Sequence, residues 1–184
     1  MNFTHASPGT AARLVLCALA ALCVLAASSA GAVEEIRVPF NFRWGDPPSL
    51  VQNTIEKAKA KVVDRSQDGT KLVLSVEGHP DPRLQRSVFT FQNEALIEVE
   101  LQYHDPSWDT SKIQSIFEQT RRNLDRKYGT SRNIARRTSE EGGVIQTVVG
   151  YQWTQEYTSL RLILYIAERE AETFRMLSYH YRGF

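Results

Sequence analysis

The chain has 184 residues, with 22 Lys or Arg against 21 Asp or Glu, which gives a net charge of +1. This balance argues against any partner that is bound through global charge alone. The length suits one domain with a substantial core.

The first 32 residues have the parts of a secretory signal peptide. Arg13 is their only charge, and an apolar run follows from Leu14 to Ala27. The run is shorter than the ~20 residues that a membrane span needs, and Ala30-Gly31-Ala32 offers a cleavage site with small residues. We therefore predict a signal peptide over 1–32, cleavage near Ala32, and a periplasmic or secreted protein. An uncleaved N-terminal anchor is the alternative.

Cleavage at this site would remove both cysteines, Cys17 and Cys23. The remaining chain would have no disulfide, no thiol nucleophile and no thiolate metal ligand. Such a domain must be stabilised by burial alone.

The first part of this domain predicts a helix after an extended segment. Residues 34–44 alternate between apolar and polar side chains, and Pro39 confines them to a sheet edge or a lead-in. Asp46 and the two prolines after it are typical of a helix start. Apolar residues then recur at helical spacing, which predicts a first helix over about 48–61.

The spacing next changes to the period of two that is typical of strands. Asp68-Gly69 predicts a hairpin turn, and Asn93-Glu94 is the expected turn of a second hairpin. Strands are expected at 62–65, 72–76, 84–91 and 96–103.

A second helix is expected over 109–128. Ile113, Phe117 and Tyr128 belong to one apolar stripe at helical spacing. Asp109 is a candidate N-cap, and Gly129 can take the left-handed position that ends a helix.

Four more strands are expected after the second helix. They lie at 131–138, 145–153, 160–166 and 174–181. Helix followed by strands therefore occurs twice, and Ser49 and Gln52 of the first helix align with Ser111 and Gln114 of the second. We predict one α+β domain over 33–184, with possible repeat halves 33–104 and 105–184.

Few residues in the sequence suggest chemistry. The three histidines beyond residue 32 are His79, His104 and His180, and they share no metal-ligand spacing. Glu98 and Glu100 share a strand face, which is more typical of a solvated face than of a catalytic pair. No nucleophile or phosphate-binding motif occurs. We expect that the protein is not an enzyme and that it has no catalytic residue, cofactor or metal. A small hydrolase is the enzymatic alternative, and it would need a pocket that joins a histidine to a carboxylate.

A basic cluster surrounds the end of the second helix. Such a cluster suits nucleic acid inside a cell, but the predicted export argues against a nucleic-acid partner. Anionic lipid headgroups, wall polymers or an acidic protein fit better, and a solvated basic face without a partner is the simpler alternative. The cluster consists of Arg121, Arg122, Arg126, Lys127, Arg132, Arg136 and Arg137.

Two short strings and the element order carry a family resemblance. Phe42-Arg43-Trp44-Gly45 precedes one helix and four strands, and a second helix ends at Lys127-Tyr128-Gly129 before another set of strands. The chain thus resembles exported proteins of the beta-lactamase-inhibitor-protein-like class, which carry tandem α-β4 units. It is also similar, more loosely, to small outer-membrane-assembly lipoproteins. The resemblance implies a protein-binding module and not an enzyme.

We expect a curved antiparallel sheet with two helices on one face, possibly a tandem α-β4 repeat. The helix-covered face should hold Phe89, Phe91, Ile97, Val99, Leu101, Val149, Tyr151, Trp153, Leu160, Leu162, Leu164, Leu177 and Tyr179. The opposite face should carry Gln92, Ile163 and Met176 together with the candidate binding residues Glu98, Glu100, Gln102, Gln146, Gln152, Arg161, Tyr165 and His180.

This uncovered face suits recognition of a protein partner in the cell envelope or outside the cell. The alternative is an envelope structural or assembly factor that docks through the basic cluster on anionic lipid or wall polymer.

Overall fold

The computed structural model describes residues 33–184, and the predicted signal peptide lies outside these residues. A short 3-10 turn, two helices and eight strands make up the described chain. They are η1 (Pro39–Asn41), α2 (Pro48–Lys57), β1 (Lys61–Asp68), β2 (Lys71–Glu77), β3 (Leu84–Gln92), β4 (Ala95–Tyr103), α3 (Thr110–Tyr128), β5 (Arg132–Glu141), β6 (Val144–Gln155), β7 (Thr158–Arg169) and β8 (Glu172–Gly183). Neither helix of residues 33–184 has the length and apolar character of a membrane span.

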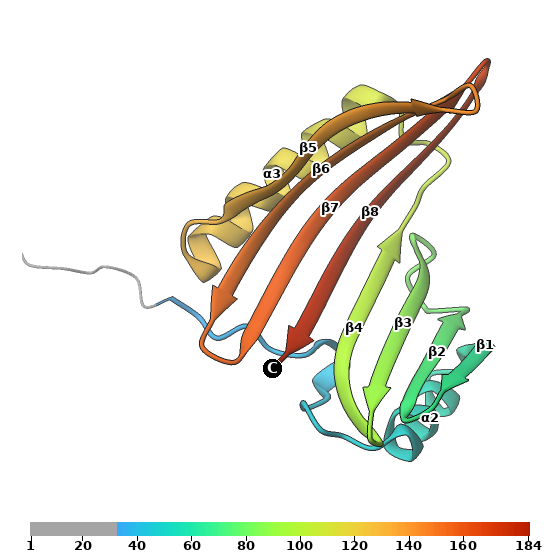
Figure 1. Ribbon diagram of the computed structural model, residues 1–184, viewed down its shortest axis with the longest axis vertical. Coiled ribbons are helices and arrows are strands. Elements are labelled where there is room, and N and C mark those ends of the chain that lie inside the picture. The colour runs from blue at the N-terminus through green and yellow to red at the C-terminus, as the bar shows by residue number, and fades with distance from the viewer. Residues whose placement is uncertain (1–32) are drawn as a thin grey trace, which may run out of the picture. The chain divides into compact units, whose positions relative to one another are not determined.

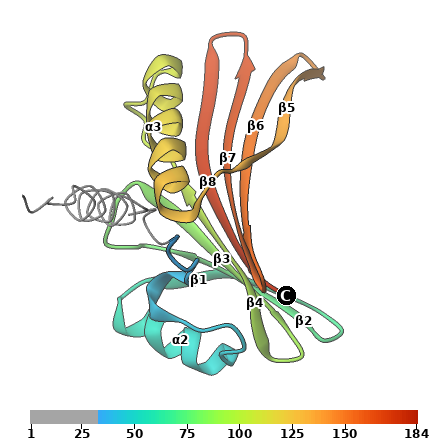
Figure 2. The ribbon, with the colours of Figure 1, turned by 90° about the vertical axis from the view of Figure 1, so that its left-hand side faces the viewer.

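All eight strands form one curved antiparallel sheet (Figure 1). Their order is β1-β2-β3-β4-β8-β7-β6-β5. The strands that follow α2 end with β4, those that follow α3 end with β8, and these two strands pair at the centre of the sheet. Both helices lie on the same face of this sheet, as Figure 2 shows from the side. The predicted α+β class is therefore confirmed. The predicted order of one helix and four strands also occurs twice, while a duplication stays a prediction.

The core lies between the helices and the covered face of the sheet. In the first half, Val51 and Ile55 of α2 are buried with strand residues such as Leu74. In the second half, Phe117 of α3 is buried with Trp153 and its neighbours. Because these side chains alternate with half-exposed ones along each strand, only one face of the sheet is closed by packing.

The second helix matches its prediction closely. The Asp109 carboxylate accepts a hydrogen bond from the backbone N–H of Lys112 at 2.7 Å and caps the helix. Gly129 ends it with a φ of 85°, which favours glycine. Local capping chemistry therefore sets both ends of α3.

The first helix is shorter than predicted. It ends at Lys57, and Lys59 takes a left-handed φ of 58°. The apolar spacing continues past this point, but Ala60 is buried and the chain turns directly into β1. Tertiary packing thus overrides the helical pattern.

Two other details differ from the prediction. Residues 34–44 form a lead-in without a strand, and a left-handed backbone at Phe40 and Asn41 interrupts their alternation. A bulge makes Ile97 the extra residue between the pairs Thr90–Glu98 and Phe91–Leu96. Leu96 is therefore buried in place of Ile97, which is half-exposed.

The two sheet edges are β1 and β5. Every residue of β1 is exposed, and both edge strands carry several charged side chains. Each edge is also interrupted by a register shift, between Val62 and Asp64 in β1 and between Asn133 and Ala135 in β5. Charges and bulges of this kind oppose pairing with another strand, so the faces are better candidates for binding than the edges.

Candidate functional site: the open face of the sheet

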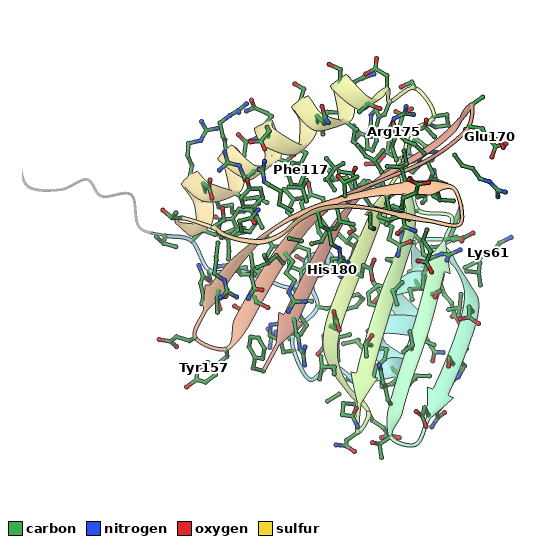
Figure 3. The ribbon with its side chains drawn as sticks, turned by 45° about the horizontal axis from the view of Figure 1, so that its top comes forward. Lys61, Phe117, Tyr157, Glu170, Arg175 and His180 are labelled. Atoms are coloured by element: carbon green, nitrogen blue, oxygen red, sulfur yellow. The ribbon has the colours of Figure 1, made fainter. Side chains whose placement is uncertain are left out.

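The face that neither helix of residues 33–184 covers, here called the open face, brings predicted residues into one row. Gln152, Arg161, His180 and Glu100 are successive cross-strand neighbours on β6, β7, β8 and β4. Cross-strand neighbours stand about 5 Å apart. Figure 3 shows His180 near the centre of the sheet, away from α3 and its Phe117. The row therefore spans both halves of the chain.

Hydrogen bonds fix the β4 and β8 part of this row. The Glu100 carboxylate accepts from the Gln102 amide at 2.8 Å and lies 3.6 Å from His180 Nδ1. His180 Nε2 lies 3.0 Å from the Ser178 hydroxyl. The side chains of His180 and Glu100 are 24% and 23% exposed, so they are accessible but already oriented.

A second group continues the row across β7 and β6. Arg161 Nε donates to the side-chain oxygen of Gln152 at 3.1 Å, and the Gln152 amide donates to the Thr154 hydroxyl at 3.0 Å. This contact holds the Arg161 side chain along the sheet, and no acidic group of residues 33–184 forms an ion pair with it. Its charge therefore remains for a ligand on the open face.

The other predicted residues of this face lie around the row. Glu98 stands opposite Arg182 of β8, and Gln146 stands opposite Ala167 near the far end of the sheet. Tyr165 stands opposite Met176, and its ring lies 6.3 Å from that of Phe174. The open face thus has a polar centre and an aromatic region beside it.

Sequence reasoning missed several members of this surface. Arg182 and Ser178 share the face of His180 because they lie two positions from it on the same strand. His104 stacks on Phe174 with ring centroids 5.2 Å apart, and its Nδ1 lies 2.7 Å from the Arg175 carbonyl. The period of two along β8 is a signal that places Arg182 on this face, whereas the stacked pair depends on the pairing of distant strands.

Ser178, His180 and Glu100 have the residue types of a serine–histidine–acid triad. The hydroxyl of Ser178 is inaccessible, however, because the residue is 1% exposed and lies between Ile163 and Gln102 on the adjacent strands. A nucleophile must reach the carbonyl of its substrate. The arrangement is therefore a hydrogen-bond network and gives no support to nucleophilic catalysis.

The predicted basic cluster does not form one surface. Arg132 and Arg137 point to the open face, opposite Gln152 and Val148. Arg136 instead donates to the Tyr151 hydroxyl on the helix-covered face at 3.2 Å. The cluster is thus divided between the two faces of β5.

The helix members of the cluster are partly neutralised. Arg121 pairs with Glu118 at 3.1 Å and with Asp125 at 2.8 Å, and its hydrogen bond with Glu118 raises its pKa. Lys127 lies 3.4 Å from the Glu34 carboxylate. Arg122 and Arg126 contact only the neutral amides of Gln119 and Asn123. These two arginines of α3 therefore have no acidic partner among the hydrogen bonds and ion pairs described for residues 33–184.

Comparison with known proteins adds no relative to this description. No protein-family model, no curated protein and no solved structure matches the chain. Within residues 33–184, no group of three His, Cys, Asp or Glu side chains is arranged to hold a metal ion.

Proposed function

We propose that the protein is an exported binding module that recognises a protein partner through its open face. The main observation in support of this proposal is the row of side chains from Gln152 to Glu100. This row crosses four strands on the open face. Side chains that are already hydrogen-bonded lose less freedom when they bind. Export rests on the signal-peptide pattern of residues 1–32.

The composition of the open face supports a protein partner. Arg161, Tyr165 and Met176 belong to residue types that are enriched at protein interfaces. The hydrogen-bonded polar centre supplies directional contacts, and the aromatic region supplies apolar area. An interface of standard size needs about 800 Å² from each partner, and the row and its surroundings extend over four strands.

The experiment compares two double variants that alter different surfaces, one on the open face and one on α3. Envelope extract is passed over the wild-type protein, the Arg161→Ala/Tyr165→Ala variant and the Arg122→Glu/Arg126→Glu variant, and captured proteins are identified by mass spectrometry. We expect the first variant to lose a partner that the second retains. Both variants leave Arg121 in place, because its ion pairs stabilise α3.

The alternative function is docking of an envelope structural factor on an anionic surface. It is favoured by Arg122 and Arg126, whose hydrogen-bond partners are neutral. In that case the charge-reversal variant, and not the open-face variant, loses binding to vesicles that contain anionic lipid. This outcome would replace the first proposal by the second.

A small hydrolase is the least supported function. The accessible histidine and carboxylate of the open face, His180 and Glu100, lie beside a serine that is buried. An esterase assay that loses all its activity on His180→Ala would nevertheless establish this function against the proposal.

A further inference from the structure

A second candidate site lies on the helix-covered face of the first half. A cavity of about 370 Å³ opens between α2, the η1 segment, the loop after β2 and strands β3 and β4. Five rings line it, those of Phe40, Phe42, His79, Phe89 and Tyr103. Small-molecule sites are typically hollows of this size with aromatic and aliphatic walls.

The cavity exists because the two helices differ in length. The ten residues of α2 extend about 15 Å, whereas the nine residues of β3 extend about 30 Å. The nineteen residues of α3 extend about 28 Å and cover their strands more fully. The first half therefore leaves part of its sheet uncovered, and the η1 segment closes this part incompletely.

The wall formed by η1 is held in a demanding conformation. Phe40 and Asn41 have φ values of 62° and 61°, a region that bulky residues seldom adopt. This backbone turns the Phe40 ring onto His79, with the two ring centroids 5.9 Å apart and the planes 6° from parallel. Phe40 remains 42% exposed. Such a strained, partly exposed aromatic residue is typical of functional sites.

The polar side chains of the cavity are few, and most already have partners: the Thr54 hydroxyl, for example, donates to the Leu50 carbonyl at 2.9 Å. Nε2 of His79 lies 2.9 Å from the Ser87 hydroxyl, and burial lowers the pKa of His79, which favours the neutral ring. Asp81 is bonded to Arg83. Burial raises the pKa of Tyr103, Asp81 and Arg83 lie near enough to influence it, and its hydroxyl takes part in none of the hydrogen bonds described for residues 33–184. A ligand would therefore meet aromatic rings, one phenol and a carboxylate that is already paired.

We propose that this cavity binds a small, uncharged aromatic molecule that carries one hydrogen-bonding group for Tyr103. Aromatic rings prefer offset or edge-to-face contacts with other rings, and the five rings of the wall offer such contacts from several sides. Asp81 is the charged side chain of this lining, and its pairing with Arg83 leaves no net charge there to hold a charged ligand. This site lies on the face opposite the open face, so it is separate from the proposed protein interface.

The first test needs only the wild-type protein, expressed from its full coding sequence. Phenol, cyclohexanol and 1-decanol are titrated separately while the backbone amide signals are followed by NMR. We expect phenol to shift the signals around Phe40, His79 and Tyr103 and to bind more tightly than either alcohol. Tighter binding of cyclohexanol or decanol would overturn the aromatic assignment. Phenol binding elsewhere, or no binding, would overturn the site.

The second test uses matched variants. Phe40→Ala removes one wall, and Phe174→Ala is its control because Phe174 is similarly exposed, at 46%, and also stacks on a histidine. We expect Phe40→Ala to weaken phenol binding at least about fivefold, roughly the effect of losing one aromatic contact, and Phe174→Ala to leave it unchanged. Equal effects would refute the assignment.

The last test isolates the hydrogen bond. Tyr103→Phe should weaken phenol binding about fivefold, the usual net effect of one neutral hydrogen bond, and leave toluene binding unchanged. The control is Tyr179→Phe, which removes a hydroxyl from the neighbouring ring. The centroids of the Tyr103 and Tyr179 rings are 5.6 Å apart. Equal weakening of phenol and toluene by Tyr103→Phe would show that its hydroxyl has no part in recognition.

Discussion

Gly183, the last residue of β8, anchors the segment that precedes α2. A Cβ atom at this position would lie 2.7 Å and 2.8 Å from two atoms of the Trp44 ring. The backbone of Gly183 lies outside the left-handed region, so alanine is opposed only by this contact. Reduced freedom of the unfolded chain would stabilise Gly183→Ala by about 0.5 kcal/mol, whereas overpacking against a rigid ring costs about 1–3 kcal/mol. The cost of overpacking should exceed the gain from the unfolded chain, so the variant should be less stable by about 1–2 kcal/mol.

Urea denaturation followed by tryptophan fluorescence measures this change, and a double-mutant cycle tests its cause. In a Trp44→Ala background the methyl group meets no ring, so Gly183→Ala should there be neutral or slightly stabilising. If Gly183→Ala costs the same in both backgrounds, the contact with Trp44 is not the reason. If it stabilises the wild-type protein, the indole moves aside freely and the reasoning fails.

Three further predictions concern stability. Asp125→Ala should lower the free energy of unfolding by about 2 kcal/mol, because the carboxylate accepts hydrogen bonds from Ser131 N and Trp153 Nε1. Asp125→Asn should cost less in the same urea titration, and equal costs would contradict this account. Burial holds the pKa of folded His79 below its ordinary 6.5, so the unfolded chain binds this proton first. The free energy of unfolding should therefore fall as the pH drops below 6.5, and less steeply in His79→Gln. Glu94→Gly should raise the melting temperature, with a gain of about 0.5–1 kcal/mol, because Glu94 has a φ of 63° in its hairpin turn; an unchanged melting temperature would refute it.

Local signals were sufficient where the structure follows local chemistry. The cap at Asp109, the stop at Gly129 and the turn at Asn93-Glu94 all lie at the predicted residues. The alternation of the strands also assigned Glu100 and His180 to the same face. These features depend on neighbours in the chain, which a sequence displays directly.

The remaining features depend on contacts between distant residues. The pairing of β4 with β8 places His180 beside Glu100, and no periodicity within either strand contains that register. The bulge at Ile97 and the early end of α2 likewise follow from packing against the sheet. The sequence predicts one basic cluster because it does not show that β5 turns Arg136 and Arg137 to opposite faces.

The cavity was missed for a related reason. Phe40, Phe42 and Phe89 looked like ordinary members of alternating segments, and His79 like a loop residue. The short α2 and the left-handed turn at Phe40 together leave these rings around a hollow. A helix predicted to continue to residue 61 would have covered more of this region, so one error in a helix boundary concealed a candidate site.

The two proposed sites use different parts of one architecture, and this makes them separable. Arg161 and Tyr165 lie on the open face, which is built from strands alone. Phe40 and Tyr103 line a cavity that α2 and η1 create on the opposite face. Changes at distant positions with no shared contacts usually act independently. A protein that loses its partner on Arg161→Ala/Tyr165→Ala should therefore still bind phenol. Coupled loss would instead indicate that ligand binding in the cavity changes the sheet on which the open face is built.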